Sequence, residues 1–347
     1  MSDPSHLDSR GVWDATSSLP DQLTQALVSA QHAFDGVSLP DRSSIEAVVV
    51  CGVGPDAQAG DAVRELTAAL SPVPLLVVPG NDVPEFVGPH TLALAVSSSG
   101  GDADVVVGAK AALARDARVV VIAADGALNT LAAEAGLPVC PVRADETAPR
   151  ASLGATVVPL LTALYRCGLI SDPASSVMGA GAALRRRSDA FANASGPAAE
   201  VARRIGRTIP IIYGASGIGA VAAQRWKSQV NLNAKSPAFH GALPASTRDE
   251  LAGWGQGGDV TRQVMSLVFL RQGVEDPRVA GLFEAVAMAT DEVMADTIEV
   301  WSEGDDDLSR FFDLILFGDF VSLFRAAREG VDPGPAPTIE DLGEGPA

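Results

Sequence analysis

Residues 91–101 read TLALAVSSSGG, an apolar run that ends in three serines and two glycines. A short, continuous apolar run is typical of a strand buried on both faces of a parallel sheet. An Ala- and Val-rich stretch of helical length follows at 103–115, so the serines lie between the end of a strand and the start of a helix. Open α/β sheets bind ligands at the carboxyl ends of their strands. The stretch therefore predicts a ligand-binding loop on a parallel sheet.

The same alternation continues on both sides of this stretch. Short runs rich in β-branched residues alternate with Ala- or Leu-rich segments that carry polar residues on one face, as expected of strands joined by crossover helices. The expected strands are 47–51, 73–78, 91–97, 118–123 and 138–142, and the expected helices are 56–70, 103–115 and 129–136. This order predicts an α/β fold with a doubly wound parallel sheet.

A similar pattern returns in the second half of the chain. The expected strands are 209–213, 264–270 and 297–301, and the expected helices are 219–233, 281–289 and 308–329. The last helix is dense in aromatic and aliphatic residues, which indicates core packing or an oligomer contact. Two similar doubly wound halves are the simplest architecture, joined by a helix over 149–169 and a helical connector over 171–195.

Composition excludes several classes of partner. The 347 residues include 43 acidic and 25 basic ones, for a formal net charge of -18. Such a chain lacks the broad basic surface that nucleic acid or anionic lipid requires. The N-terminus has neither the basic start nor the apolar stretch of a secretory signal, and the longest apolar runs are too short to cross a bilayer. We expect a cytoplasmic protein that binds neither nucleic acid nor a membrane.

The three cysteines, Cys51, Cys140 and Cys167, lie in apolar runs without a Cys-x-x-Cys pair or flanking histidines. This pattern indicates buried, reduced thiols rather than a disulfide framework or a zinc site. No metal and no cofactor is expected.

Two glycine- or serine-rich turns are candidate ligand sites. The first, with Gly52 and Gly54, follows a strand and opens a helix, whose free backbone N–H groups attract anions. The second, Ser97, Ser98 and Ser99, brings three short hydroxyl donors to a helix start, which suits the phosphate of a small sugar phosphate. The alternative is that these serines only form a turn and a helix cap. A nucleotide site is disfavoured, because neither turn completes a dinucleotide fingerprint or a P-loop.

Taken in order and with their spacing, several short motifs resemble the bifunctional phosphoglucose/phosphomannose isomerase family, and within it the divergent TobH-like members. The matching segments are Gly52-Val53-Gly54, Ala59-Gly60-Asp61, Ser97-Ser98-Ser99-Gly100, Ala148-Pro149-Arg150-Ala151, Arg225-Trp226-Lys227, Asn233-Ala234-Lys235 and Leu243-Pro244. The resemblance implies two sugar-isomerase (SIS) domains, each a flavodoxin-like αβα sandwich, in a homodimer. It implies a first SIS domain over 45–170, a connector over 171–197 and a second SIS domain over 198–330. An N-terminal helical or extended arm over 1–44 precedes them, and a disordered tail over 331–347 follows.

The resemblance also implies roles for individual residues. The serine-rich loop holds the phosphate in that family, so Ser97, Ser98 and Ser99 would bind it here, with Gly52 and Gly54 in the neighbouring turn. The arginine of the Pro-Arg-Ala segment contacts substrate near the reacting carbons, which assigns that contact to Arg150.

The family's proton-transfer residues have no counterpart in this sequence. Leu232 stands where the family has a general-base glutamate, Arg248 where it has a ring-opening histidine, and Gly343 where it has a lysine. Leucine cannot accept a proton, and the loss of a general base costs about 100-fold to 10,000-fold in rate. Two more departures affect the loops: Asp56 follows Pro55 where the family has Gly-Ser, and Asp102 replaces a threonine and would repel phosphate.

Two residues of the second half are candidate substitutes for the missing acid and base. His240 lies in an expected loop after Lys235, and its imidazole has a suitable ordinary pKa. Glu250 follows Asp249 and Arg248, although the two carboxylates also suit the cap of the helix that follows. His240 and Glu250 are therefore the candidate catalytic residues, with no assigned role.

Three hypotheses remain open. The first is a sugar-phosphate-binding SIS protein with weak or absent isomerase activity and a regulatory or partner role in hexose-phosphate metabolism. The second is an active aldose-ketose isomerase, converting glucose 6-phosphate or mannose 6-phosphate to fructose 6-phosphate with relocated residues or a group from a neighbouring subunit. The third is an interaction protein without a small-molecule site.

Overall fold

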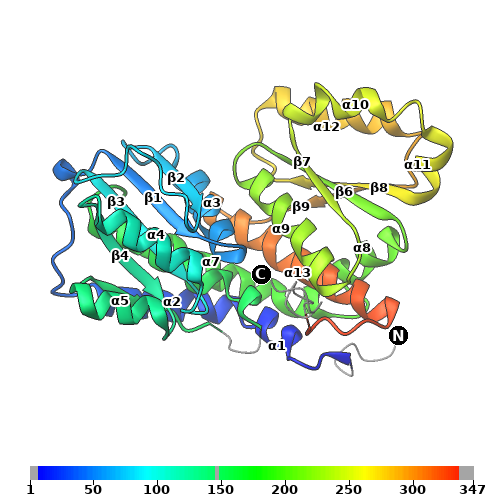
Figure 1. The fold of residues 1–347 in the computed structure, drawn as a ribbon. Coiled ribbons are helices and arrows are strands. Elements are labelled where there is room, and N and C mark those ends of the chain that lie inside the picture. Colours follow the sequence, from blue (N-terminus) through cyan, green and yellow to red (C-terminus); the bar gives the residue numbers. More distant parts are fainter. Residues whose placement is uncertain (1–6, 145–147, 336–347) are drawn as a thin grey trace, which may run out of the picture. The chain divides into compact units, whose positions relative to one another are not determined.

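The computed structural model describes residues 7–144 and 148–335, which divide into two compact units (Figure 1). The N-terminal unit consists of Ser18–Arg185 together with Gly304–Ser309. The C-terminal unit consists of Arg186–Glu303 and the described parts of Met1–Ser17 and Arg310–Ala347. The domain boundaries expected from the sequence stay a prediction, and most of the expected tail, 336–347, lies outside the described residues.

The N-terminal unit is built on a sheet of five parallel strands in the order β2-β1-β3-β4-β5. The strands are β1 (Ala47–Gly52), β2 (Leu75–Pro79), β3 (Thr91–Ser97), β4 (Arg118–Ala123) and β5 (Val139–Pro141). Every residue of β3 is buried, as its apolar run predicts for a central strand. This strand order is the flavodoxin-like doubly wound one, so the predicted fold class is confirmed for this half.

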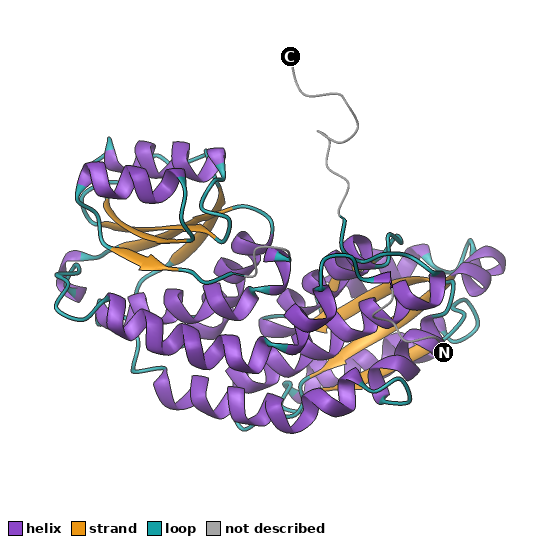
Figure 2. Ribbon diagram, turned by 90° about the horizontal axis from the view of Figure 1, so that it is seen from below, coloured by secondary structure: helices purple, strands orange, loops and turns teal. Residues whose placement is uncertain are grey.

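Helices cover both faces of this sheet (Figure 2). On one face, the inward side chains of the strands pack against α4 (Ala103–Leu113) and α5 (Ala127–Ala135). On the other lie α3 (Pro55–Thr67) and α6 (Leu153–Arg166), with α2 (Leu19–Ala33) packed on α6. A 3-10 turn, Pro149–Ala151, precedes α6, and α7 (Ala174–Ala192) forms the predicted helix after it.

The C-terminal unit has a second parallel sheet in the order β7-β6-β8-β9. Its strands are β6 (Ile209–Ala215), β7 (Phe239–Leu243), β8 (Met265–Arg271) and β9 (Thr297–Trp301). The expected position of His240 in a loop is wrong, because this residue lies on β7. β7 is an edge strand with a mostly exposed face, so it lacks the continuous apolar run of a buried strand and is held by pairing with β6.

The helices of this unit are α1 (Val12–Ser17), α8 (Pro197–Ile205), α9 (Ile218–Asn233), α10 (Glu250–Gly253), α11 (Gly258–Val264), α12 (Pro277–Thr290) and α13 (Asp307–Glu329). The aromatic residues of α13 are buried, as expected of core packing. Trp226 of α9 stacks on Phe317 at a centroid distance of 5.9 Å, and Trp13 of α1 contacts Phe320 edge-on at 5.2 Å. Aromatic contacts therefore join α13 to α9 and to α1.

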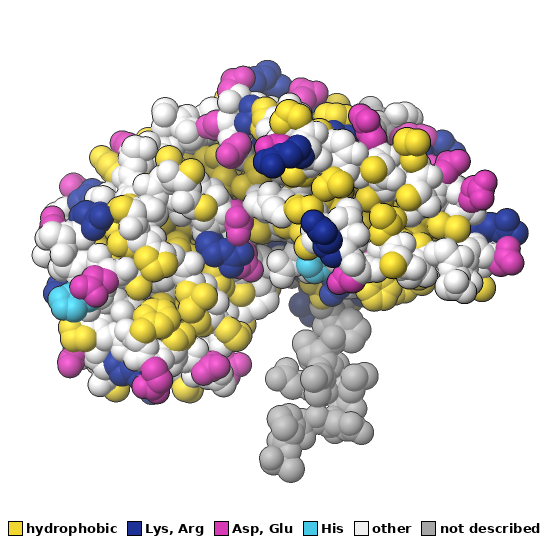
Figure 3. Space-filling model, turned by 90° about the horizontal axis from the view of Figure 1, so that it is seen from above, with side chains coloured by type: hydrophobic (Ala, Val, Ile, Leu, Met, Phe, Trp, Pro, Cys, Tyr) yellow, Lys and Arg dark blue, Asp and Glu magenta, His cyan; other side chains and the backbone are white. Residues whose placement is uncertain are grey.

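The three cysteines are free and buried, as expected, and burial raises the pKa of the Cys51 thiol to about 11. Over the described ranges, no helix is long and apolar enough to span a membrane. Figure 3 shows Lys and Arg side chains scattered singly among acidic ones on the face in view. This face offers no broad basic surface of the kind that nucleic acid requires.

Candidate functional site

The two loops singled out in the sequence lie side by side at one edge of the first sheet. β1 pairs with β3 in register, with Cys51 opposite Ala95, so both strands end at the same level. The turn at Gly52–Gly54 and the serine loop after Ser97 therefore meet at the carboxyl ends of adjacent strands. This is the edge where open parallel sheets bind ligands.

Asp56, in the first turn of α3, connects these loops. Its Oδ2 accepts one hydrogen bond from the Ser98 backbone N–H at 2.8 Å and a second from the Ser98 hydroxyl at 3.0 Å. Only 4% of Asp56 is exposed. Burial raises the pKa of its carboxyl to about 6, against the opposing effect of the two Ser98 hydrogen bonds, and the nearby Asp102 charge adds to the increase.

Asp102, the residue before α4, contacts the other two serines. Its Oδ2 accepts a hydrogen bond from the Ser99 hydroxyl at 2.9 Å and another from the Ser97 hydroxyl. A serine hydroxyl has a single proton to donate. All three hydroxyl protons of the loop are thus directed at carboxylates, Ser98 at Asp56 and the other two at Asp102.

Two backbone donors of the loop are also engaged. The Gly100 N–H donates to the Ser97 carbonyl at 3.2 Å, and the Gly101 N–H donates to the Ser99 hydroxyl oxygen at 3.3 Å. In this arrangement the loop presents oxygen acceptors and negative charge, because its three hydroxyl donors are already used. A phosphate would have to displace at least one carboxylate to reach the serine hydroxyls.

Gly100 gives the loop its sharp turn. Its φ of +71° lies in the left-handed region, and a Cβ built there would lie 2.3 Å from the Ala124 carbonyl oxygen. Gly126 approaches from the other side, where its own Cβ would lie 2.3 Å from the Gly100 carbonyl oxygen. The loop after β3 and the loop after β4 therefore touch backbone to backbone, which only glycine allows.

A cavity of about 620 Å³ opens beside the serine loop. Ser98 and Ser99 line one part of it, and residues that follow β4 and β5, among them Asp125 and Arg143, line another. Arg143 is exposed, and it makes no hydrogen bond or ion pair with any residue that the structure describes. The sequence analysis missed Arg143, because a single arginine after a three-residue edge strand has no local pattern that distinguishes it from a solvated side chain.

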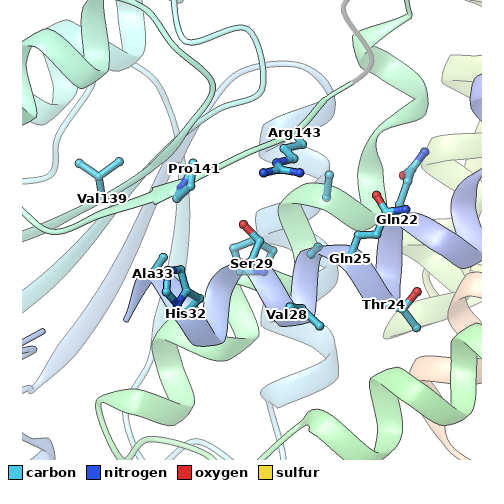
Figure 4. A pocket seen from close by; sticks show the side chains of 13 residues that line it. Gln22, Thr24, Gln25, Val28, Ser29, His32, Ala33, Val139, Pro141 and Arg143 are labelled. Atoms are coloured by element: carbon cyan, nitrogen blue, oxygen red, sulfur yellow. The ribbon is translucent and has the colours of Figure 1, made fainter. Parts of the chain in front are cut away.

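Arg143 also lines a second cavity, of about 700 Å³, beside α2, α6 and β5. Figure 4 shows Pro141 and Arg143 on one side of this space and Ser29 and His32 of α2 on the other. The guanidinium of Arg143 therefore lies at both cavities.

The other predicted binding residues, Arg150, Gly54 and Gly52, differ in how close the structure places them to the cavity. Pro149 lines the cavity beside the serine loop, so the Pro-Arg-Ala segment approaches it, and Arg150 is half-buried in the 3-10 turn that follows. Gly54 has a φ of +53° and precedes α3. A Cβ at Gly52 would lie 3.0 Å from the Ala57 nitrogen, so this glycine allows the helix to begin close to the strand. Contacts of Gly52, Gly54 and Arg150 with a ligand stay predictions.

The assignment of Leu232, Arg248 and Gly343 to the family's catalytic positions stays a prediction. Leu232 is half-buried near the end of α9, and Arg248 is exposed. Gly343 lies outside the described residues.

The two substitute candidates both belong to the C-terminal unit. His240 lies on β7, not in a loop, opposite Ile212 of β6. Partial burial and the Lys227 ammonium lower its pKa, while the Glu250 carboxylate opposes this effect. Glu250 accepts hydrogen bonds from the Tyr213 hydroxyl at 2.6 Å and from the Ser246 hydroxyl at 3.1 Å. Asp249 caps α10 by accepting from the Glu250 N–H at 2.7 Å, so the capping interpretation of Asp249 is confirmed.

Comparison with known proteins supports the resemblance seen in the motifs. Residues 194–344 match the family model for the bacterial phospho-glucose isomerase C-terminal SIS domain. A bifunctional phosphoglucose/phosphomannose isomerase of Caldicellulosiruptor bescii is 28% identical over 338 residues, which cover 95% of this chain and 97% of the relative. Over nearly its whole length the chain is thus similar to bifunctional phosphoglucose/phosphomannose isomerases, and its second half matches their C-terminal SIS domain.

Further relatives extend this family match. The isomerase of the same description from Aquifex aeolicus is 28% identical over 305 residues, or 88% of this chain and 91% of the relative. Among solved structures, tagatose-6-phosphate ketose/aldose isomerase from Escherichia coli has a TM-score of 0.69 at 14% identity, with 94% of this chain and 95% of that chain covered. At this identity the structural match concerns the fold, and it agrees with two SIS domains. The finer resemblance to TobH-like members stays a prediction.

Proposed function

We propose that the protein binds a sugar phosphate at the serine loop of its N-terminal unit and has weak or absent isomerase activity, with a regulatory or partner role. One observation carries the proposal: the three-serine loop that the resemblance assigns to phosphate is present, with Ser98 and Ser99 at a cavity, while Leu232 stands where the resemblance places the general base. The curated relatives are named phosphoglucose/phosphomannose isomerases, which favours a hexose phosphate as the ligand.

Charge at the cavity bears on the binding step. Arg143 lines the cavity and makes no hydrogen bond or ion pair with any described residue, and Arg150 follows the lining residue Pro149. A guanidinium suits a phosphate because it presents several N–H donors in a fixed plane. The positive charge would offset part of the repulsion from the two aspartates once the phosphate reaches the serine hydroxyls.

The chemical step lacks its proton acceptor. Moving a proton between C1 and C2 of a sugar phosphate requires a base within hydrogen-bond reach. The Leu232 side chain has no lone pair, so we expect turnover to fall by about 100-fold to 10,000-fold relative to a family member that has the glutamate.

An active isomerase with relocated residues is the second candidate function, and the state of His240 favours it. A lowered pKa keeps the imidazole neutral at pH 7, where it can accept a proton. Glu250 is less suitable as a base, because both of its oxygens already accept hydrogen bonds.

A ligand panel with turnover measurements tests the proposal. Thermal unfolding is followed with glucose 6-phosphate, mannose 6-phosphate, fructose 6-phosphate and the corresponding free sugars, and isomerisation of each phosphate is assayed. We expect the phosphates to raise the melting temperature while the free sugars do not, since a ligand that binds only the folded state stabilises it. Turnover at ordinary enzymatic rates contradicts the loss of activity, and its disappearance in His240→Ala assigns it to the second candidate.

Site variants locate the binding. The double variant Ser97→Ala, Ser99→Ala should lose the stabilisation by phosphates. Ser29→Ala is the matched control, because Ser29 lines the other cavity that Arg143 reaches. Loss of stabilisation in Ser29→Ala, with the double variant unaffected, would move the site to that second cavity. The absence of any stabilisation of the parent protein would favour an interaction protein without a small-molecule site.

A homodimer and a cytoplasmic location are also proposed, as the family resemblance suggests. Light scattering of the purified protein during gel filtration measures the oligomeric state directly. A monomer at micromolar concentration would rule out a site that depends on a second subunit.

A further inference from the structure

The carboxylate of Asp102 occupies the donors on which the phosphate loop depends. Its Oδ2 accepts from the Ser97 hydroxyl and from the Ser99 hydroxyl at 2.9 Å, and these two hydroxyl oxygens are 3.3 Å apart. A phosphate oxygen held by the same serines would need those same two protons. Asp102 therefore satisfies the loop from within the chain, as a bound anion would.

We propose that Asp102 is a specificity-determining residue that competes with the ligand's phosphate for the hydroxyls of Ser97 and Ser99, so that phosphate binds only when this carboxylate is displaced. The inference rests on the proposed function, because it concerns the same loop and the same ligand class. Beyond the proposed function, the inference names the Asp102 carboxylate as the group that sets the affinity for the phosphate.

The local geometry indicates that Asp102 serves the loop and not the helix. Asp102 is the N-cap residue of α4, with an extended backbone at φ -63° and ψ 110°, yet its side chain makes no capping hydrogen bond. Aspartate is a favoured residue type at the N-cap, so its usual role here would be to accept hydrogen bonds from the N–H groups of α4. Its side chain turns instead to Ser97 and Ser99, and a threonine at this position would be free to cap the helix.

A second negative charge strengthens the effect. Asp56 holds Ser98 from the α3 side, so the loop lies between two carboxylates. Repulsion between a phosphate and one carboxylate a few Å away corresponds to an affinity loss on the order of tenfold to a hundredfold at the effective dielectric of a protein surface. Removing the Asp102 charge should raise the phosphate affinity by a factor of this size. The repulsion from Asp56 remains, so only one of the two contributions is recovered.

Two variants and a matched control test the inference. Asp102→Thr removes the charge and adds a hydroxyl, Asp102→Asn removes only the charge, and Asp104→Asn removes one charge from the first turn of α4. Asp104 is exposed and accepts from Asn81 Nδ2 at 3.2 Å, without a contact to the serine loop that the structure records. Binding of inorganic phosphate, fructose 6-phosphate and fructose is measured by calorimetry, with circular dichroism as the check of folding.

We expect Asp102→Thr and Asp102→Asn to bind fructose 6-phosphate and inorganic phosphate at least tenfold more tightly than the parent protein, with fructose unchanged. Asp104→Asn should change the affinity by less than threefold, since a more distant exposed charge is screened by salt. Equal effects in Asp102→Asn and Asp104→Asn overturn the inference, because the gain in phosphate affinity would then follow from the change in net charge alone. An unchanged affinity in both Asp102 variants overturns it as well.

The same measurements separate this inference from the proposed function. If the parent protein binds fructose 6-phosphate and the Asp102 variants bind it no better, the proposed function stands and the inference fails. If only the Asp102 variants bind it, the inference stands and the proposed function of the natural protein fails. If none of the proteins binds a phosphate, both fail, because removing Asp102 then does not open the loop.

Discussion

Asp56 accepts two hydrogen bonds from Ser98, one from the backbone N–H at 2.8 Å and one from the hydroxyl at 3.0 Å. The two residues are 42 positions apart: Asp56 lies in the first turn of α3, which follows β1, and Ser98 lies in the loop after β3. A buried carboxylate that receives two donors holds the loops together, but burial also makes its ionised form costly. This conflict gives the protein a measurable dependence on pH.

Stability should fall as Asp56 ionises. Its folded-state pKa of about 6 lies above the ordinary 3.8, so the folded state binds the proton more tightly than the unfolded state. The stabilising contribution is complete below pH 3.8 and is lost as the pH rises through about 6. The shift corresponds to about 3 kcal/mol.

Urea unfolding of the parent protein and of Asp56→Asn between pH 4.5 and 8 measures this contribution. The difference in unfolding free energy should move in favour of Asp56→Asn as the pH rises, and level off above about pH 7. Taking the difference between the two proteins cancels the pH dependence that comes from the carboxylates they share. A difference that does not change with pH would contradict the assignment of the raised pKa to Asp56.

Replacement of Gly100 should destabilise the N-terminal unit. An alanine there needs a φ of +71° and places its Cβ 2.3 Å from the Ala124 carbonyl oxygen. We expect Gly100→Ala to lower the unfolding free energy by about 2 kcal/mol or more. Gly101→Ala is the matched control, because nothing lies within 4 Å of its added Cβ, and its cost should stay below about 1 kcal/mol. Equal costs at both positions would refute the close approach of the two loops.

The buried pair of Arg225 and Asp319 should be costly to break. Arg225 Nη2 lies 2.7 Å from Asp319 Oδ2, and the two side chains are 1% and 6% exposed. Arg225→Met leaves a buried charge without this partner, for an expected loss of about 3–5 kcal/mol, and Arg225→Met with Asp319→Leu should recover most of it. The control Arg64→Met breaks a half-exposed pair with Asp61, worth less than about 1 kcal/mol. Chemical unfolding measures all three variants. No recovery in the double variant would mean that the loss comes from packing alone.

The hydroxyl of Tyr213 should stabilise the position of Glu250. It donates to Glu250 Oε2 at 2.6 Å, and burial together with this carboxylate raises the pKa of the phenol. Tyr213→Phe should lower the unfolding free energy by about 1.5–3 kcal/mol, the usual contribution of a hydrogen bond to a charged group. Tyr165→Phe changes the other tyrosine, which is exposed, and should have little effect. If the two variants unfold alike, the Tyr213 bond does not hold Glu250.

The sequence was sufficient for the central part of both sheets. Strands β1, β3, β4, β6 and β8 lie between other elements, so their side chains are apolar on both faces and their runs are visible in a single sequence. β7 was missed because an edge strand needs no such run, and its backbone pairing comes from a neighbour that the local sequence does not contain.

The sequence by itself determined the fold class, the resemblance to the isomerase family and the place of the serine loop at a strand end, while the replacement of the general base by Leu232 stays a prediction. These follow from local patterns, or from motifs in order along the chain. Only the tertiary structure decided what the serines contact. Asp56 and Asp102 each looked like an isolated departure from the family pattern, and the structure brings both onto the same loop, together with Arg143 at the adjoining cavity. The reason is that parallel pairing of β1, β3 and β4 aligns strand ends that are far apart in the chain, and hydrogen bonds depend on that alignment rather than on neighbouring letters.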